Sequence, residues 1–154
     1  MISPELLRRY PFFARLDDAQ LKVIAMISQE QVIEKGTVLF QEGQPADAIY
    51  LLEKGGIDLY FTVAESGGSA SREYLVDEID AGEVFGISSL IDPYILTSNA
   101  RASQYSRIVC IQGAGLRKAC EKDQHMAYLL MQQVAKAFAE RLHYCRIQLA
   151  AARV

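Results

Sequence analysis

The segment FGISSLIDPYILTSNARA, from Phe85 to Ala102, has the layout of a loop that could hold a small anion. Its Phe85-Gly86 pair marks a tight turn, and an apolar stretch suited to one turn of helix follows. Glycine would let backbone N–H groups approach a ligand, and a helix start favours an anion. Yet no lysine or arginine stands between residues 85 and 99. The loop therefore has the frame of an anion pocket without a counter-charge.

Uncharged polar side chains, most of them hydroxyls, remain available to a ligand in this loop. Ser88 and Ser89 stand at the expected helix start, and Thr97, Ser98 and Asn99 lead into the next strand. Two interpretations stay open. In the first, the serines cap the helix and alternate strand residues face water. In the second, the hydroxyls line a neutral pocket for an uncharged or weakly anionic ligand.

Cysteines and histidines do not occur in a pattern that binds metal. Cys110, Cys120 and Cys145 form no C-x-x-C pair, and His125 and His143 both fall in one predicted helix. The chain also lacks a nucleophile elbow and a phosphate-binding loop of the G-x-x-x-x-G-K type. We therefore expect no metal, no cofactor and no enzymatic activity.

The composition describes one domain of mixed charge. The 154 residues include 16 basic and 19 acidic side chains, for a formal net charge of −3. A surface built to neutralise nucleic-acid phosphates is usually basic, so direct binding of DNA or RNA is not expected. The first residues, MISPELLRRYPFF, do not have the pattern of a signal peptide, and no apolar run approaches the roughly 18 residues that span a bilayer. We expect a cytoplasmic protein without membrane association.

The elements that must position this loop change in character along the chain. Asp17 and Gln20 form the pattern of a capping box at the start of a helix. Short strands separated by glycine-rich turns follow, which favours a sandwich or barrel over a parallel sheet. We divide the single domain 1–154 into N-terminal helices (1–30), a β-barrel (31–113) and C-terminal helices (114–154).

Alternating apolar residues mark the clearest strand of the barrel region. Ile57, Leu59, Phe61 and Val63 recur at every second position, which predicts a strand with one buried face. Further strands are expected at 37–40, 49–52, 74–76 and 108–111, and one of the turns between strands is Ser66-Gly67-Gly68-Ser69.

Residues 123–150 predict one long helix with two apolar strips. One strip alternates spacings of three and four as in a coiled coil, and consists of Tyr128, Met131, Ala135, Phe138, Leu142, Cys145 and Leu149. The second strip contains Leu130, Val134 and Ala137. Such a helix can pack on its own barrel with one strip and on a partner with the other. The sequence therefore predicts a homodimer formed through this helix, with binding of another protein as a further possibility.

In this order, the elements resemble those of the cyclic-nucleotide-binding domain, the sensor domain of the catabolite-activator family and of cyclic-nucleotide-regulated kinases and channels. The similar segments are LRRYPFFARL (7–16), GTVLFQEG (36–43), ADAIYLLEKG (46–55), GEVFG (82–86), Arg101-Ala102 with the 108–111 strand, and the helix from Leu130 to Leu142. The resemblance implies an α+β fold: an antiparallel double-stranded β-helix (jelly-roll) barrel flanked by N-terminal helices and a long C-terminal helix. No DNA-binding domain of the activator type is recognised.

The resemblance also shows what the loop lacks. Members that bind cyclic nucleotides carry a Glu for the ribose hydroxyl and an Arg for the cyclic phosphate. Here Ile87 occupies the first position, and Leu96, or Thr97 with a different gap, occupies the second. Loss of a charged partner at a buried phosphate costs about 3–5 kcal/mol, enough to weaken a micromolar site to millimolar. The family's adenine-contacting positions correspond to Cys145 and Arg146, where a large cation departs from the small hydroxyls of activators.

Three hypotheses follow. The first is a regulatory module that binds a small molecule, either a cyclic nucleotide weakly or another ligand, and signals through the long helix. The second is a scaffold without a ligand, in which Ile87 and Leu96 fill the pocket and the helix serves association. The third is that the sequence is the sensor half of a longer transcription regulator.

Overall fold

The computed structural model describes residues 1–68 and 70–153, beginning with two short helices. Helix α1 spans Pro4–Arg8 and helix α2 spans Asp18–Met26. The predicted capping box is confirmed: Asp17 Oδ1 accepts from the Gln20 N–H at 2.8 Å, and Gln20 Oε1 accepts from the Asp17 N–H at 3.0 Å. These bonds fix where α2 begins and how it enters the core.

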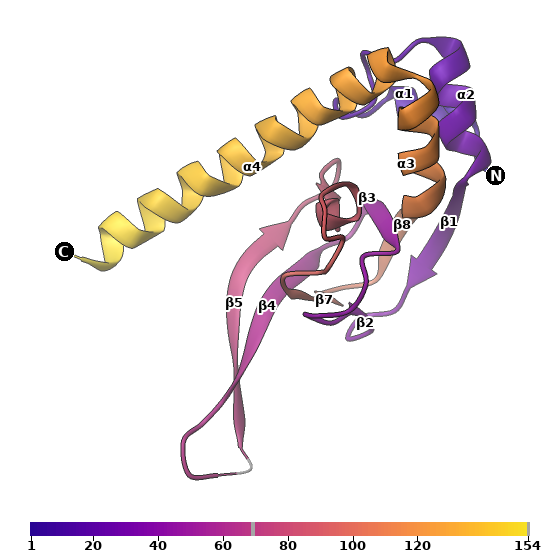
Figure 1. Ribbon diagram of the computed structural model, residues 1–154. Helices are drawn as coiled ribbons and strands as arrows, with labels where there is room; N and C mark the ends of the chain where they lie inside the picture. Colours follow the sequence, from indigo (N-terminus) through magenta and orange to yellow (C-terminus); the bar gives the residue numbers. More distant parts are fainter. Residues whose placement is uncertain (69, 154) are drawn as a thin grey trace.

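Two four-stranded antiparallel sheets form the barrel, with strand orders β1-β8-β3-β6 and β2-β7-β4-β5. The strands are β1 (Ser28–Ile33), β2 (Val38–Phe40), β3 (Ala48–Lys54), β4 (Ile57–Ala64), β5 (Ser71–Ile79), β6 (Val84–Phe85), β7 (Asn99–Ala102) and β8 (Ser106–Gln112). With its flanking helices this is the expected α+β fold (Figure 1). Strand β1 begins three residues earlier than the barrel was expected to begin.

Two apolar cores hold the layers together. One lies between the two sheets and includes Leu52, Ile57, Phe85 and Ile108. The other joins the first sheet to the N-terminal helices, α3 (Gly113–Lys122) and the start of α4 (Gln124–Ala152). Burial of apolar surface of this kind contributes about 25 cal/mol per Å² to folding. The loop that starts at Phe85 begins where the two cores meet, because Phe85 belongs to one and Ile87 to the other.

The β4–β5 hairpin corrects one part of the strand prediction. The register with β5 shifts between Leu59 and Tyr60, so the inward face changes there. Tyr60 is therefore buried, whereas Phe61 and Val63, expected on the buried face, are 36% and 50% exposed. A bulge of this kind cannot be seen in a regular alternation of residues. Ser69, in the predicted turn of this hairpin, lies outside the described residues.

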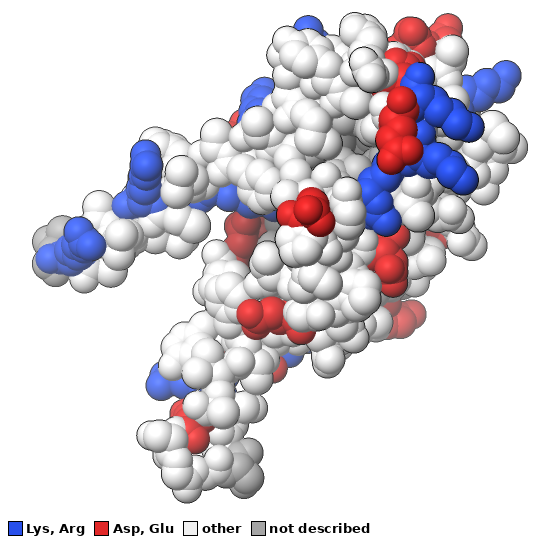
Figure 2. Space-filling view, viewed as in Figure 1, with Lys and Arg blue, Asp and Glu red and all other residues white. Residues whose placement is uncertain are grey.

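Helix α4 is the long helix expected at 123–150, with the Asp123 carboxylate capping it through the Met126 N–H at 3.0 Å. It leaves the body of the domain and projects past the barrel (Figure 1). In the described residues, no helix combines the length and apolar character needed to cross a bilayer. Figure 2 shows acidic and basic side chains interspersed over the N-terminal helices.

A carboxyl pair on the first sheet predicts a pH-dependent stability. Burial and the neighbouring Glu30 carboxyl raise the pKa of Glu53 to about 7 from 4.5, against the opposing charges of Arg107 and Arg9. The folded state therefore keeps a proton that the unfolded chain releases between those values, so stability is lost as pH rises towards 7.

We expect Glu53→Gln to raise the melting temperature by a few degrees at pH 8 and to have little effect at pH 5. The change should stay near 1 kcal/mol because Glu53 is partly exposed to solvent. Thermal unfolding of both proteins across this range measures the difference. A constant difference between pH 5 and pH 8 would contradict the assigned pKa.

Candidate functional site

The candidate site is the segment between β6 and β7, and its entrance depends on Gly86. Gly86 has a φ of 71° and precedes a single 3-10 turn, η1 (Ile87–Leu90). A Cβ at this position would lie 2.9 Å from Tyr50 Cδ2 and 3.0 Å from the Ala48 carbonyl oxygen. Both the positive φ and the tight contact therefore require glycine. Packing against β3 accounts for this glycine without a ligand.

Aromatic rings form the floor beneath the turn. The Phe85 ring stacks on Tyr50 with centroids 5.0 Å apart and lies 6.2 Å from the Phe40 ring. Phe85 is fully buried, and burial raises the pKa of Tyr50 to about 12. Phe85 therefore anchors the turn and does not line the cavity above it.

Most of the loop residues singled out in the sequence converge on one small cavity of about 60 Å³. Its walls consist of Gly86, Ile87, Ser88, Leu96, Thr97 and Ser98 from the loop, Phe40 and Leu59 from the barrel, and Phe138 and Arg141 from α4. Ligand pockets usually measure about 300–1,000 Å³, so in this conformation the site is nearly filled.

Hydrocarbon takes up the space that a ligand would need. Ile87 and Leu96 are 3% and 6% exposed. The Ser89 side chain is fully buried beside the cavity, and its Oγ has no hydrogen-bond partner among the described residues. Ser88, Thr97 and Ser98 contribute hydroxyl groups to the wall. The cavity is thus narrowed by aliphatic side chains, and hydroxyl groups form part of its lining.

Arg141 of α4 supplies the one charge at the wall of this cavity and was missed as a site residue. Its Nη2 donates to the Val84 carbonyl oxygen at 2.6 Å, and its Nε lies 3.4 Å from Asp77 Oδ2. The helical spacing could have predicted that Arg141 lies against the barrel, because this residue continues the strip of Leu130, Val134 and Ala137 by one turn. The strip of α4 that packs on the barrel therefore ends in Arg141, whose guanidinium binds a backbone carbonyl of the barrel.

The other wall from α4 is the Phe138 ring, which is 46% exposed. Cys145 and Arg146, one turn further along the helix, are exposed and do not line the cavity. The structure therefore brings Phe138 and Arg141 to the loop and leaves the two positions suggested by resemblance outside it.

Asn99 and Arg101 make contacts within the barrel. Asn99 is buried, accepts from the Glu42 N–H at 2.9 Å and donates to the Tyr60 carbonyl at 3.1 Å. Arg101 donates to both carboxylate oxygens of Glu73, at 3.1 and 2.7 Å, and stacks over the Tyr60 ring. This pairing holds the pKa of Glu73 below its usual value. Neither side chain lines the cavity, so neither replaces the absent cation.

Comparison with known proteins identifies the family. The sequence model of the cyclic nucleotide-binding domain matches residues 30–123, which contain the barrel, the loop and α3. The chain is 45% identical to a candidate cyclic nucleotide-binding protein of Geobacter metallireducens GS-15, over 93% of this chain and 100% of that one. Their structures align with a TM-score of 0.81.

Two curated proteins are also similar. One is the cAMP-dependent protein kinase regulatory subunit of Dictyostelium discoideum, 29% identical over 69% of this chain. The other is a candidate potassium channel protein of Rhodopseudomonas palustris, 22% identical over 87%. The chain spans 31% of the length of each of them. From the family match and the close structural relative, this chain belongs to the cyclic nucleotide-binding domain family.

Proposed function

We propose that this domain is a regulatory module in which the position of α4 reports the state of the loop cavity. The observation that carries the proposal is that Phe138 and Arg141 of α4 form the outer wall of the cavity. A cavity of about 60 Å³ cannot accept a nucleotide unless this wall moves. Ligand entry and displacement of α4 are then one event, which is the coupling that a regulatory domain requires.

Cyclic nucleotides are weak ligands of this module. Ile87 and Leu96 offer neither an acceptor for the ribose nor a cation for the phosphate, and both are buried. A phosphate placed beside them would lose its water without a charged partner. The relatives named for cyclic nucleotides support the class of ligand, and the altered residues set its low affinity. The module is proposed to act in the cytoplasm.

A scaffold without a ligand is the second candidate, favoured by the hydrocarbon that fills the cavity. Under that proposal α4 serves only for association with a second copy or another protein. The two candidates differ in whether the loop can still bind a cyclic nucleotide once an arginine is placed where the family carries one.

Restoring the cation tests this difference. We expect the wild type to bind cyclic AMP in the millimolar range or more weakly, and Leu96→Arg to bind at least about tenfold more tightly. Isothermal calorimetry measures both, with Leu96→Met as the control of similar volume and circular dichroism as the check of folding. Micromolar binding by the wild type would contradict the proposal that Ile87 and Leu96 leave the nucleotide without its polar partners. Equal affinities of folded Leu96→Arg and Leu96→Met would favour the scaffold.

Association through α4 has its own test. The residues of the coiled-coil strip, from Tyr128 to Leu149, are all exposed, whereas Leu130 and Val134 of the second strip are buried. We propose that this strip forms a homodimer, and expect Leu142→Asp to convert it into a monomer, because the substitution places a charge in the apolar contact. Tyr105→Asp, at an equally exposed site of the barrel, should leave the dimer intact. Sedimentation velocity distinguishes them, and an unchanged Leu142→Asp oligomer would show that the strip is misplaced.

A further inference from the structure

The end of α4, from Leu142 onwards, is exposed along its whole length. The buried residues of the helix are Met126, Leu129, Leu130 and Val134, all in its first half. Every residue from Leu142 to Arg153 is exposed. Four of them are large and apolar, with exposed fractions of 51–66%: Leu142, Tyr144, Ile147 and Leu149. An apolar helix surface of this extent indicates a contact with another surface.

This end of the helix is basic. Residues 141–153 contain Arg141, Arg146, Arg153 and His143, and no aspartate or glutamate. Arg141 is engaged with the barrel, whereas Arg146 and Arg153 extend from the exposed part. Figure 2 shows basic side chains, and no acidic ones, on the visible described surface of this projecting segment. The partner surface should therefore be apolar and acidic.

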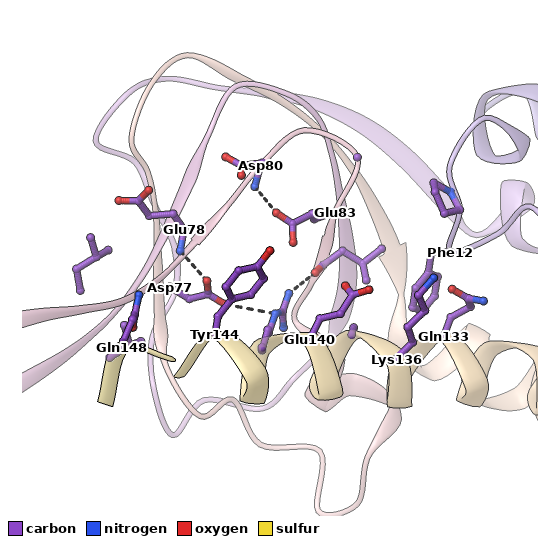
Figure 3. Close-up of a pocket in the computed structure, with 17 residues that line it drawn as sticks. Phe12, Asp77, Glu78, Asp80, Glu83, Gln133, Lys136, Glu140, Tyr144 and Gln148 are labelled. Atoms are coloured by element: carbon purple, nitrogen blue, oxygen red, sulfur yellow. Dashed lines mark hydrogen bonds and ion pairs between the residues drawn. The ribbon is translucent and has the colours of Figure 1, made fainter. Parts of the chain in front are cut away.

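A groove of matching character lies between β5, the turn that follows it, and α4. Its volume is about 790 Å³ and it is distinct from the loop cavity, although Arg141 lines both. Apolar atoms of Phe12, Val76 and Ala137 contribute to its lining. In Figure 3 the groove is bordered on one side by the strand and turn and on the other by α4, with Tyr144 and Lys136 along the helix.

Carboxylates dominate the charge of the groove. Five acidic residues line it against two basic ones, Lys136 and Arg141: Asp77, Glu78, Asp80, Glu83 and Glu140. Arg141 already faces Asp77, which leaves the remaining carboxylates in excess. Figure 3 shows them coming from both the strand side and the helix side. The groove therefore favours a cationic occupant.

The length of the groove suits the projecting end of a second α4. The groove follows its own α4 from Gln133 to Gln148, about 22 Å at 1.5 Å per residue. The basic segment from 141 to 153 is about 18 Å long by the same rule. We propose that the groove of each copy receives the basic outer half of α4 from a second copy of this chain. The proposal rests on the association through α4 described above and names the surfaces that meet.

Two-fold symmetry fits this arrangement. In an isologous dimer each helix end enters the partner's groove, so both contacts form at once. Arg146 and Arg153 of one copy then face the acidic side chains of the other, while Ile147 covers apolar lining. These charges would lie at the rim of the contact. Their contribution to the affinity of the dimer should therefore fall as the salt concentration rises, and should reverse when one charge of a pair is reversed.

A charge exchange tests the pairing. The helix variant carries Arg146→Glu and Arg153→Glu, and the groove variant carries Glu78→Lys and Asp80→Lys. At about 0.05 M salt we expect each variant to raise the dimer dissociation constant about tenfold or more. Combined in one chain, the four substitutions should restore it to within about threefold of the wild type, since each contact regains opposite charges. Analytical ultracentrifugation measures all four proteins.

Controls separate this proposal from the association itself. The control variant carries Lys22→Glu and Lys35→Glu, at exposed sites away from the groove. It changes the net charge by as much as the helix variant does, and should leave the dissociation constant unchanged. If Leu142→Asp dissociates the dimer but the charge variants do not, the helices associate and the groove contact is wrong. Loss in both charge variants without recovery in the combination would also overturn the pairing. A monomeric wild type would contradict both proposals.

Discussion

The contact of Arg141 with the barrel is the interaction on which the arrangement of the site depends. Its guanidinium bonds to the carbonyl of Val84, immediately before the Phe85-Gly86 turn, and faces Asp77 on β5. One side chain thereby fixes α4 to the strand that leads into the loop. Charge-assisted hydrogen bonds of this kind are stronger than neutral ones, especially when partly shielded from water. With Arg141 in place, Phe138 lies over the cavity and the groove opens on the other side.

The interior of the loop completes this closed state. A turn that must be glycine, an aromatic floor and two buried aliphatic side chains leave about 60 Å³ of space. We propose that the frame of the family is kept while hydrocarbon, at Ile87 and Leu96, replaces the polar groups that would hold a nucleotide. Such a replacement stabilises the empty form and lowers affinity through the same residues. A domain of this kind would respond only to a ligand able to displace α4.

Features encoded by local sequence were predictable. The capping box at Asp17 and Gln20 fixed α2, and Asp123 set the start of the long helix. Turn glycines and short apolar runs indicated an antiparallel barrel, and the pattern around residues 85–102 located the cavity. In each case a few neighbouring residues determine the backbone, so the sequence contains the signal.

Features that depend on residues distant in the sequence could not be predicted. The register shift between Leu59 and Tyr60 arises from pairing with β5 and turns Phe61 and Val63 outwards. The destination of Arg141 depends on where α4 crosses the barrel, which no local pattern specifies. Cys145 and Arg146 were placed at the site by resemblance alone, and lie outside the cavity because the helix has already left the barrel there.

The central claim is that Arg141 holds α4 over the loop cavity. Because the chain contains no tryptophan, Phe138→Trp places a single fluorescent reporter in the cavity wall. We predict that adding Arg141→Gln shifts its emission to longer wavelength and makes it more accessible to acrylamide, whereas Lys136→Gln on the same helix changes neither. Emission and quenching unaffected by Arg141→Gln would contradict the claim.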